Sequence, residues 1–218
     1  MQITIRNATL LDIPFLVETI IEAEKSGTNT LSYSTIFGLS EADAKKYIAL
    51  MLDEEVDDCE LSVNAFLVAE LNGETLGAVC AWIEEAEGVS SSTLKGNLLR
   101  FTLPNKCFES LTKISSLIKE LHIDYIPKTI QIGLVYISEK ARGKGLVQEL
   151  LNKKIQQLQQ DNQEVSEVYV QVFGHNKAAI KAYEKVGFET IESKFAKSEE
   201  ITNYLPSASK IVMKLNKK

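Results

Sequence analysis

Apolar positions recur with two different periods along this chain, and the periods predict its elements. Alternation at Ile3 and Ile5 is typical of a half-buried strand. Over Leu11–Lys25 the apolar residues return every three to four positions, as they do along one face of a helix. Ser40 then begins a second helix as its N-cap. The chain is therefore expected to open with a strand and two helices, and residues 33–38 between the helices are expected to form a loop with exposed aromatic side chains.

A β-hairpin follows, and its turn is the strongest hairpin signal in the sequence. Residues 65–71 and 75–83 are apolar runs separated by Asn72-Gly73. Asn-Gly between apolar runs is typical of a type I′ turn, in which both central residues have positive φ. Residues 88–128 then hold helical material, most clearly over 107–121, and they separate the hairpin from the next apolar run. This segment is expected to be an insertion into a smaller unit.

The stretch from Thr129 to Gln160 reads as a strand, a short turn and a helix. Gly143 and Gly145 stand where that helix begins. The first N–H groups of a helix have no intrahelical partner and carry partial positive charge, and glycine lets another group approach them closely. The joint is therefore a candidate cradle for a phosphate or pyrophosphate. It lacks the GxxxxGKS or GxxxxGKT string of a P-loop and the third glycine of a dinucleotide-binding loop.

The remaining elements predict a mixed sheet. Residues 168–173 form a strand, and Asn176 caps a short helix that Gly187 ends. Two strands over 188–192 and 210–215 close the chain. A hairpin combined with a strand–helix–strand unit argues for a single α/β domain spanning all 218 residues, with helices on the faces of a mixed sheet.

Composition narrows the classes of partner. The formal net charge is −6 and the Lys and Arg residues are dispersed, so no nucleic-acid footprint is expected. The three cysteines have no metal-ligand spacing, which favours reduced thiols in a cytoplasm and no metal cofactor. No apolar stretch indicates a signal peptide or a membrane span. The sequence thus predicts a cytoplasmic protein with no membrane partner.

Two motifs in the C-terminal half resemble those of the GCN5-related N-acetyltransferase (GNAT) family. The family's acyl-CoA signature, Arg/Gln-x-x-Gly-x-Gly/Ala, is similar to the run from Arg142 to Val147, although Val147 replaces the final Gly or Ala. The family's second motif, Asn-x-x-Ala-x-x-x-Tyr-x-x-x-Gly-Phe, matches residues 176–188 in full. Both ends of the chain look like those of the family, whereas residues 88–128 have no counterpart in it.

This resemblance implies an α/β acyl-CoA N-acyltransferase fold, with a mostly antiparallel sheet that splays at the cofactor site and helices on both faces. It implies acetyl-CoA as cosubstrate. The pantetheine arm would pair with the backbone of the central strand, and the pyrophosphate would lie at the glycine cradle with two basic side chains adding charge. The cofactor-binding residues implied in this way are Val135, Tyr136, Ile137, Arg142, Gly143, Lys144, Gly145, Leu146, Val147, Asn176, Ala179 and Tyr183.

The resemblance also implies a general acid and leaves the base to be found. The hydroxyl of Tyr183 would protonate the departing thiolate; without the motif, Tyr183 reads as a core residue, and Asn176 reads as a helix N-cap. Some family members use a Glu on the central strand as base, and that position holds Gln131, which cannot accept a proton. Glu84, followed by Glu85 at the end of the hairpin, is the base expected in its place, with a water chain as the alternative.

Together these features predict an N-acetyltransferase that moves acetyl from acetyl-CoA to a primary amine by direct attack in a ternary complex. The acceptor is expected to be a small-molecule amine or a protein amine. The alternative is a non-catalytic acyl-CoA-binding regulatory module, since one fold hosts many functions. Residues 88–128 are expected to cover one end of the acceptor cleft or to make a subunit contact in a homodimer.

Overall fold

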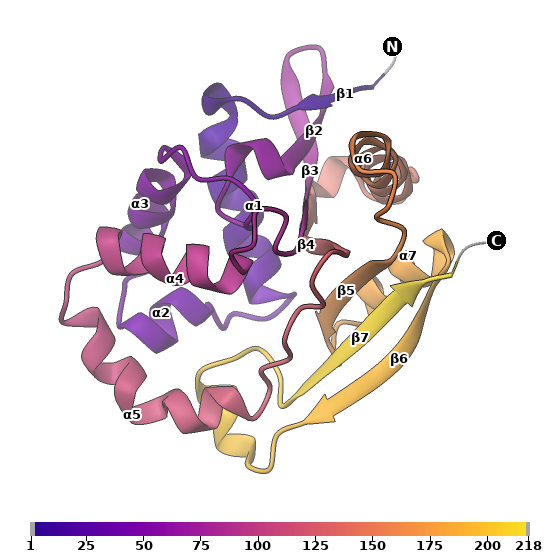
Figure 1. Ribbon diagram of the computed structural model, residues 1–218. Coiled ribbons are helices and arrows are strands. Elements are labelled where there is room, and N and C mark those ends of the chain that lie inside the picture. Colours follow the sequence, from indigo (N-terminus) through magenta and orange to yellow (C-terminus); the bar gives the residue numbers. More distant parts are fainter. Residues whose placement is uncertain (1–2, 217–218) are drawn as a thin grey trace.

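Seven strands form one open sheet at the centre of the molecule (Figure 1). The computed structural model describes residues 3–216. The strands lie in the order β1-β2-β3-β4-β5-β7-β6. Their bounds are β1 Thr4–Asn7, β2 Phe66–Leu71, β3 Glu74–Ile83, β4 Ile130–Ile137, β5 Val168–Phe173, β6 Phe188–Phe195 and β7 Ser209–Leu215. Only β4 and β5 are parallel neighbours, so the predicted mostly antiparallel mixed sheet is confirmed.

Helices cover both faces of this sheet, as predicted. Their bounds are α1 Ile13–Lys25, α2 Ser32–Phe37, α3 Glu41–Leu52, α4 Ser91–Thr102, α5 Cys107–Lys119, α6 Leu146–Asp161 and α7 Lys177–Val186. Helices α1, α3 and α4 bury side chains against one face of β2 and β3, where Phe66 and Val68 lie. Helices α6 and α7 pack on the other face, against Leu67 and Ala69. Successive residues of a strand point to opposite faces of the sheet, so β2 contributes side chains to the hydrophobic clusters on both faces.

Local signals placed several elements correctly. The β2–β3 hairpin turns at Asn72-Gly73, where φ is 54° and 81°, the positive values that a type I′ turn requires. Ser40 caps α3, because its side chain accepts a hydrogen bond from the Asp43 N–H at 3.0 Å. Gly187 ends α7 in the left-handed conformation.

Residues 33–38, expected to be a loop with exposed aromatics, are instead mostly helical. Helix α2 spans Ser32–Phe37 and ends at Gly38, where φ is 67°. Tyr33 is only 3% exposed, and its ring lies against that of Phe37 with the centroids 6.1 Å apart. The expectation was wrong because burial against the neighbouring helices, rather than local sequence, fixes this turn of helix.

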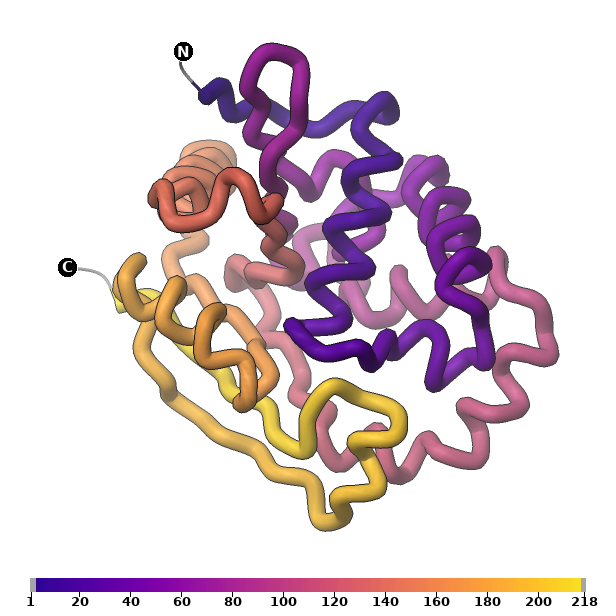
Figure 2. Tube along the Cα trace, turned by 180° about the vertical axis from the view of Figure 1, so that it is seen from behind, coloured from indigo at the N-terminus to yellow at the C-terminus, as the bar shows by residue number. Residues whose placement is uncertain are grey.

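Residues 88–128 form α4 and α5 and pack across one end of the sheet. The apolar stripe of α5 joins a buried cluster with α2 and with the turn that precedes β7, built around Ile36, Leu121, Ile201 and Leu205. Figure 1 shows α5 running beside that C-terminal turn, which is yellow, and Figure 2 shows the same arrangement from behind. This segment therefore joins the N-terminal helices to the C-terminal strands.

Candidate active site

The parallel strands β4 and β5 pair only at their beginnings and then separate. Their register covers Ile130–Ile132 against Val168–Val170 and goes no further. A β-bulge follows in β4, where Gly133 and Leu134 together oppose a single residue of β3. Glycine is required in the bulge because a Cβ at Gly133 would lie 2.5 Å from a ring carbon of Trp82. The sheet is thus splayed open beyond residue 132, as expected.

The backbone of β4 is directed into this gap. Ser138 donates its N–H to the Leu76 carbonyl at 2.8 Å, on the β3 side. Backbone N–H groups alternate in direction along a strand, so those of Val135 and Ile137 face the open side. The Ile137 carbonyl accepts a hydrogen bond from Arg142 Nε at 3.1 Å. These are the positions at which an extended ligand would pair with the strand.

A loop of unpaired N–H groups borders the gap where α6 begins. Gly143 and Gly145 have φ of 77° and 78°, the left-handed region that favours glycine. Within residues 3–216, the N–H groups of residues 143–148 donate no hydrogen bond to the protein. A Cβ at either glycine would meet no atom within 4 Å, so the loop faces open space. Unpaired donors at a helix start form an anion cradle.

A cavity of about 550 Å³ lies between this loop, the end of β4 and helix α7. Of the residues implied as cofactor-binding, all but Lys144 line it, and the Lys144 side chain is exposed to solvent. Arg142 lies at the cavity edge. Its guanidinium donates hydrogen bonds to the Ile137 carbonyl and to the Glu139 carboxylate. The predicted set is therefore brought together around one concavity, with Lys144 as the exception.

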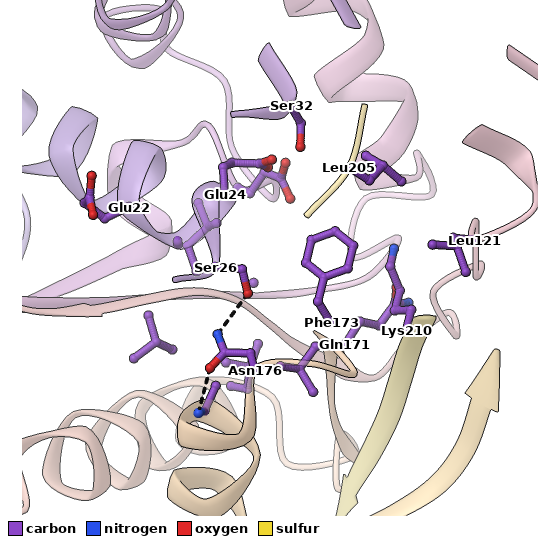
Figure 3. Close-up of a pocket in the computed structure, with 18 of the residues that line it drawn as sticks. Glu22, Glu24, Ser26, Ser32, Leu121, Gln171, Phe173, Asn176, Leu205 and Lys210 are labelled. Atoms are coloured by element: carbon purple, nitrogen blue, oxygen red, sulfur yellow. Dashed lines mark hydrogen bonds between the residues drawn. The ribbon is translucent and has the colours of Figure 1, made fainter. Parts of the chain in front are cut away.

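Asn176 connects the start of α7 to the end of α1. Its side-chain oxygen accepts from the Ala179 N–H at 3.0 Å, which caps α7, and its Nδ2 donates to Ser26 Oγ at 2.9 Å, as drawn in Figure 3. The neighbouring His175 ring nitrogen Nε2 lies 2.9 Å from the Ser26 carbonyl oxygen. These contacts hold α1 and α7 together across the gap in the sheet.

Tyr183 lies deeper in the same region. It is 6% exposed, and its ring packs edge-on against Phe188 with the centroids 5.8 Å apart. Its hydroxyl makes no hydrogen bond within residues 3–216. Burial raises the pKa of this phenol, so the hydroxyl keeps its proton at neutral pH.

A second cavity of about 380 Å³ meets the first at the wall that contains Tyr183. Val135, Asn176, Ala179 and Tyr183 line both cavities. The second cavity extends from there toward α1, the end of α5 and the start of β7. Its apolar wall includes Leu121, Phe173 and Leu205, which Figure 3 shows, together with Ile36 and Ile118. The two cavities therefore adjoin at the wall that the four shared residues form.

Acidic and basic side chains also line the second cavity. Burial raises the pKa of Glu24, and Lys95 partly offsets this effect. Lys95 forms an ion pair with Glu60. Lys210 lies over the Phe173 ring, with its Nζ 5.8 Å from the centroid. Sequence reasoning missed Glu24 and Lys210, because neither stands in a motif and only the fold brings the end of α1 next to the start of β7.

Glu84, expected to be the base, lies outside both cavities. It is 2% exposed, and its carboxylate accepts hydrogen bonds from Trp82 Nε1 at 2.9 Å and from Ser91 N at 3.0 Å and Oγ at 2.5 Å. These bonds fix the start of α4. Gln131 is likewise buried, and it donates to Thr129 Oγ1 at 2.7 Å. Neither side chain is placed to take a proton from a molecule in the second cavity.

Two other features bear on the chemistry. Among the residues that the structure describes, no group of three or more His, Cys, Asp or Glu side chains is arranged to hold a metal ion. Over the same part of the chain, no helix has the length and apolar character to cross a membrane.

Comparison with solved structures finds the same fold in several N-acetyltransferases. An N-acetyltransferase from Staphylococcus aureus Mu50 matches with a TM-score of 0.66 and 16% identity, covering 97% of this chain and 100% of that one. A polyamine N-acetyltransferase of Drosophila melanogaster that forms N-acetylagmatine matches with a TM-score of 0.59 and 13% identity, covering 99% and 100%. AAC(6')-Ib in complex with ribostamycin and coenzyme A matches with a TM-score of 0.52 and 17% identity, covering 100% and 94%.

Comparison of the sequence with protein-family profiles identifies the family to which the chain belongs. No curated protein matches the chain. Residues 34–188 match the sequence profile of the acetyltransferase (GNAT) family, and this range includes both motifs and the whole glycine cradle. The match shows that this chain belongs to the GNAT acetyltransferase family, whose fold the splayed sheet shares.

Proposed function

We propose that this protein is an acetyl-CoA-dependent N-acetyltransferase that acetylates a primary amine by direct attack in a ternary complex. One observation carries the proposal: the anion-cradled cavity and the second cavity meet at Tyr183. Acyl transfer in one step needs donor and acceptor side by side. Membership of the family supports the reaction type, and the neighbours AAC(6')-Ib with acetyl-CoA and agmatine N-acetyltransferase support the pair of substrates.

In this proposal the first cavity holds acetyl-CoA. The unpaired N–H groups of residues 143–147 bind the pyrophosphate, and Arg142 adds positive charge at the edge. The N–H groups of Val135 and Ile137 pair with the pantetheine arm, which takes the place of a missing strand. The sulphur then lies at the point where the cavities meet, near Tyr183. Lys144, being exposed, contributes only long-range charge.

Tyr183 serves as the general acid. As the amine nitrogen bonds to the acetyl carbon and the C–S bond breaks, the Tyr183 hydroxyl gives its proton to the thiolate. Its raised pKa keeps that proton in place until the thiolate forms. The absence of a hydrogen-bond partner within residues 3–216 leaves the hydroxyl free to turn toward the sulphur.

We assign the base to Glu24 in place of Glu84. Glu24 lines the acceptor cavity and carries a raised pKa, whereas the Glu84 carboxylate is occupied by Trp82 and Ser91. A carboxylate with a raised pKa is a stronger base at neutral pH than an ordinary surface carboxylate. Glu24 takes one proton from the ammonium form of the acceptor, directly or through one water. That proton leaves before the nitrogen attacks, and Glu24 passes it to solvent. The nitrogen gives up its second proton as the C–S bond breaks, and this proton restores the Tyr183 hydroxyl through water.

The acceptor class follows from the size of the second cavity. A space of about 380 Å³ with one apolar wall suits a small-molecule amine, and small-molecule sites are commonly about 300–1,000 Å³. A peptide amine would extend out of the cavity, and the NatC complex, which shares the fold, is bound to a peptide. We therefore place a small-molecule amine first and a peptide amine second.

Release of free CoA from acetyl-CoA tests the proposal. We expect the release to depend on an added amine and to be matched by acetylated product, because transfer requires both cavities to be filled. A protein that binds acetyl-CoA tightly but releases no CoA with any amine or peptide would instead be a regulatory acyl-CoA-binding module.

A further inference from the structure

Two charges in the acceptor cavity have no ion-pair partner. Among the described residues, the charged side chains that line it are Glu22, Glu24, Glu60, Lys95 and Lys210. Glu22 pairs with Lys25 at 3.2 Å, and Lys95 pairs with Glu60. Glu24 and Lys210 form no ion pair within residues 3–216, with each other or with any other residue. The cavity therefore presents one unpaired anion and one unpaired cation.

Lys210 is placed where a lysine is unfavourable without a ligand. It is the second residue of β7, opposite Phe173 of β5, and its ammonium lies over the face of the Phe173 ring. Burial lowers its pKa, and the field of Glu24 opposes that effect. Lys210 is half-buried, and a cation partly withdrawn from water without a hydrogen-bonded anion is unfavourable. A bound anion would supply the missing partner and favour the charged form.

Glu24 and Lys210 are also placed to act on one molecule. Each affects the pKa of the other, so they share one electrostatic environment although they are not in contact. In Figure 3 they lie on either side of the Phe173 side chain, with Leu205 and Leu121 nearby. The space between the two charges is bordered by apolar and aromatic side chains. This pattern is complementary to a molecule with an ammonium, a carboxylate and an apolar body.

We propose that the acceptor is an amino acid, in which the amine meets Glu24 and the carboxylate meets Lys210. This inference rests on the proposed N-acetyltransferase function and narrows it. A polycationic acceptor would set a second positive charge against Lys210, and like charges in a partly buried site disfavour binding. A simple amine would leave Lys210 without a partner. Only the carboxylate-bearing amine pairs both charges of the cavity.

Matched acceptors test this directly with the full-length protein. Phenylalanine, phenylalanine amide and phenethylamine share ring and amine, and differ in having a carboxylate, a neutral carboxamide or neither. Arginine and agmatine form a second pair. We expect kcat/KM, measured by CoA release, to be at least tenfold higher for the better amino acid than for its analogues without a carboxylate, because a site built for a polar group discriminates against molecules that lack it.

Variants separate charge recognition from general packing. Lys210→Met keeps the length of the side chain and removes the ammonium; it should raise KM for the amino acid and remove its advantage over the amide. Lys214→Met is the matched control, since Lys214 also lies on β7 over an aromatic ring, that of Tyr169, but lines neither cavity. It should behave as wild type. Melting temperatures check folding, and Lys210→Met should not be less stable, because it removes a half-buried cation that has no ion-pair partner among the described residues.

The outcomes distinguish this inference from the function on which it rests. Turnover of phenethylamine or agmatine with no gain from the carboxylate would overturn the amino-acid proposal and leave the N-acetyltransferase intact. An unchanged preference in Lys210→Met would also overturn it. Release of no CoA with any acceptor would contradict both proposals.

Discussion

At the scale of single residues, the proposed reaction depends on two groups that line the second cavity from different sides. Tyr183 lies on α7 and keeps a proton because burial raises its pKa. Glu24 lies near the end of α1, and burial raises the pKa of its carboxyl. Both pKa values are raised, but the two shifts serve different roles in the proposed reaction. A raised pKa keeps the Tyr183 acid protonated, and it makes the Glu24 carboxylate more basic.

Replacement of Tyr183 by Phe should affect rate alone. The ring, its packing on Phe188 and the helix remain, and only the proton is lost. We expect kcat to fall by roughly 10²–10⁴-fold, the range for one acid–base group, with little change in acetyl-CoA affinity because the acid acts on charge that appears as the bond breaks. The hydroxyl has no partner in residues 3–216 to leave unsatisfied, so the melting temperature should also be unchanged. Wild-type turnover in this variant would contradict the acid role and would mean that Tyr183 serves only to pack the core.

The pH dependence of kcat/KM should reveal Glu24. A base works only when deprotonated, so activity should be lost as pH falls through its pKa. Because burial raises that pKa, the acidic limb should lie above the ~4.3 of an ordinary glutamate. The groups that surround it and shape this limb are Lys95 of α4, Glu60, Tyr33 of α2 and Lys210 of β7.

Glu24→Gln should remove this limb and lower kcat/KM by roughly 10²-fold or more. Glu22→Gln is the control, since Glu22 lines the same cavity but is paired with Lys25. An acidic limb that persists unchanged in Glu24→Gln would assign the base elsewhere.

At the scale of elements, the β4–loop–α6 unit forms the proposed acetyl-CoA site, and a substitution at Gly145 tests this assignment. Its φ of 78° strains any other residue, and a side chain there would extend toward the space assigned to the phosphates. Gly145→Glu should weaken acetyl-CoA binding at least tenfold, about 1.4 kcal/mol, as measured by calorimetric titration. Gly88→Glu provides the control, because Gly88 has a φ of 79° in open space but lines neither cavity. Equal affinities of wild type and Gly145→Glu for acetyl-CoA would contradict the assignment of the pyrophosphate to this loop.

Helix α5 should influence the acceptor and leave the cofactor site unchanged. Ile118 lines the acceptor cavity, whereas Leu117 beside it packs in the cluster around Leu121 and lines neither cavity. Ile118→Phe should fill part of the cavity and raise the acceptor KM by roughly tenfold or more, with the Kd of acetyl-CoA unchanged. Leu117→Phe should leave both constants near wild type. A loss of acetyl-CoA binding in a folded Ile118→Phe protein would contradict this arrangement.

The same scale explains what the sequence could predict. Features set within a few residues were recovered, such as the Asn72-Gly73 turn and the cap at Asn176, because local backbone chemistry determines them. Helix α2 was missed because its burial comes from distant elements. Glu24 and Lys210 could not be predicted as lining residues for the same reason. The position of Glu84 at the end of a strand does not reveal that Trp82 and Ser91 occupy its carboxylate.

At the scale of the whole molecule, the fold brings the two cavities together where β4 and β5 separate, and the proposal places the donor in one and the acceptor in the other. Helix α1 and helix α7 are held across this opening by the Ser26–Asn176 bond. No cysteine lines either cavity in the described part of the chain, where all three thiols are buried. The proposed direct transfer between two bound molecules needs no such thiol.

Initial rates of CoA release, measured over a matrix of acetyl-CoA and acceptor concentrations, test this account most directly. Direct attack in a ternary complex predicts double-reciprocal lines that intersect, and intact-mass measurement with acetyl-CoA alone should detect no acetylated protein. Parallel lines together with a stable acetyl-protein would contradict the account, because they would mean that the acetyl group passes through a side chain before it reaches the amine.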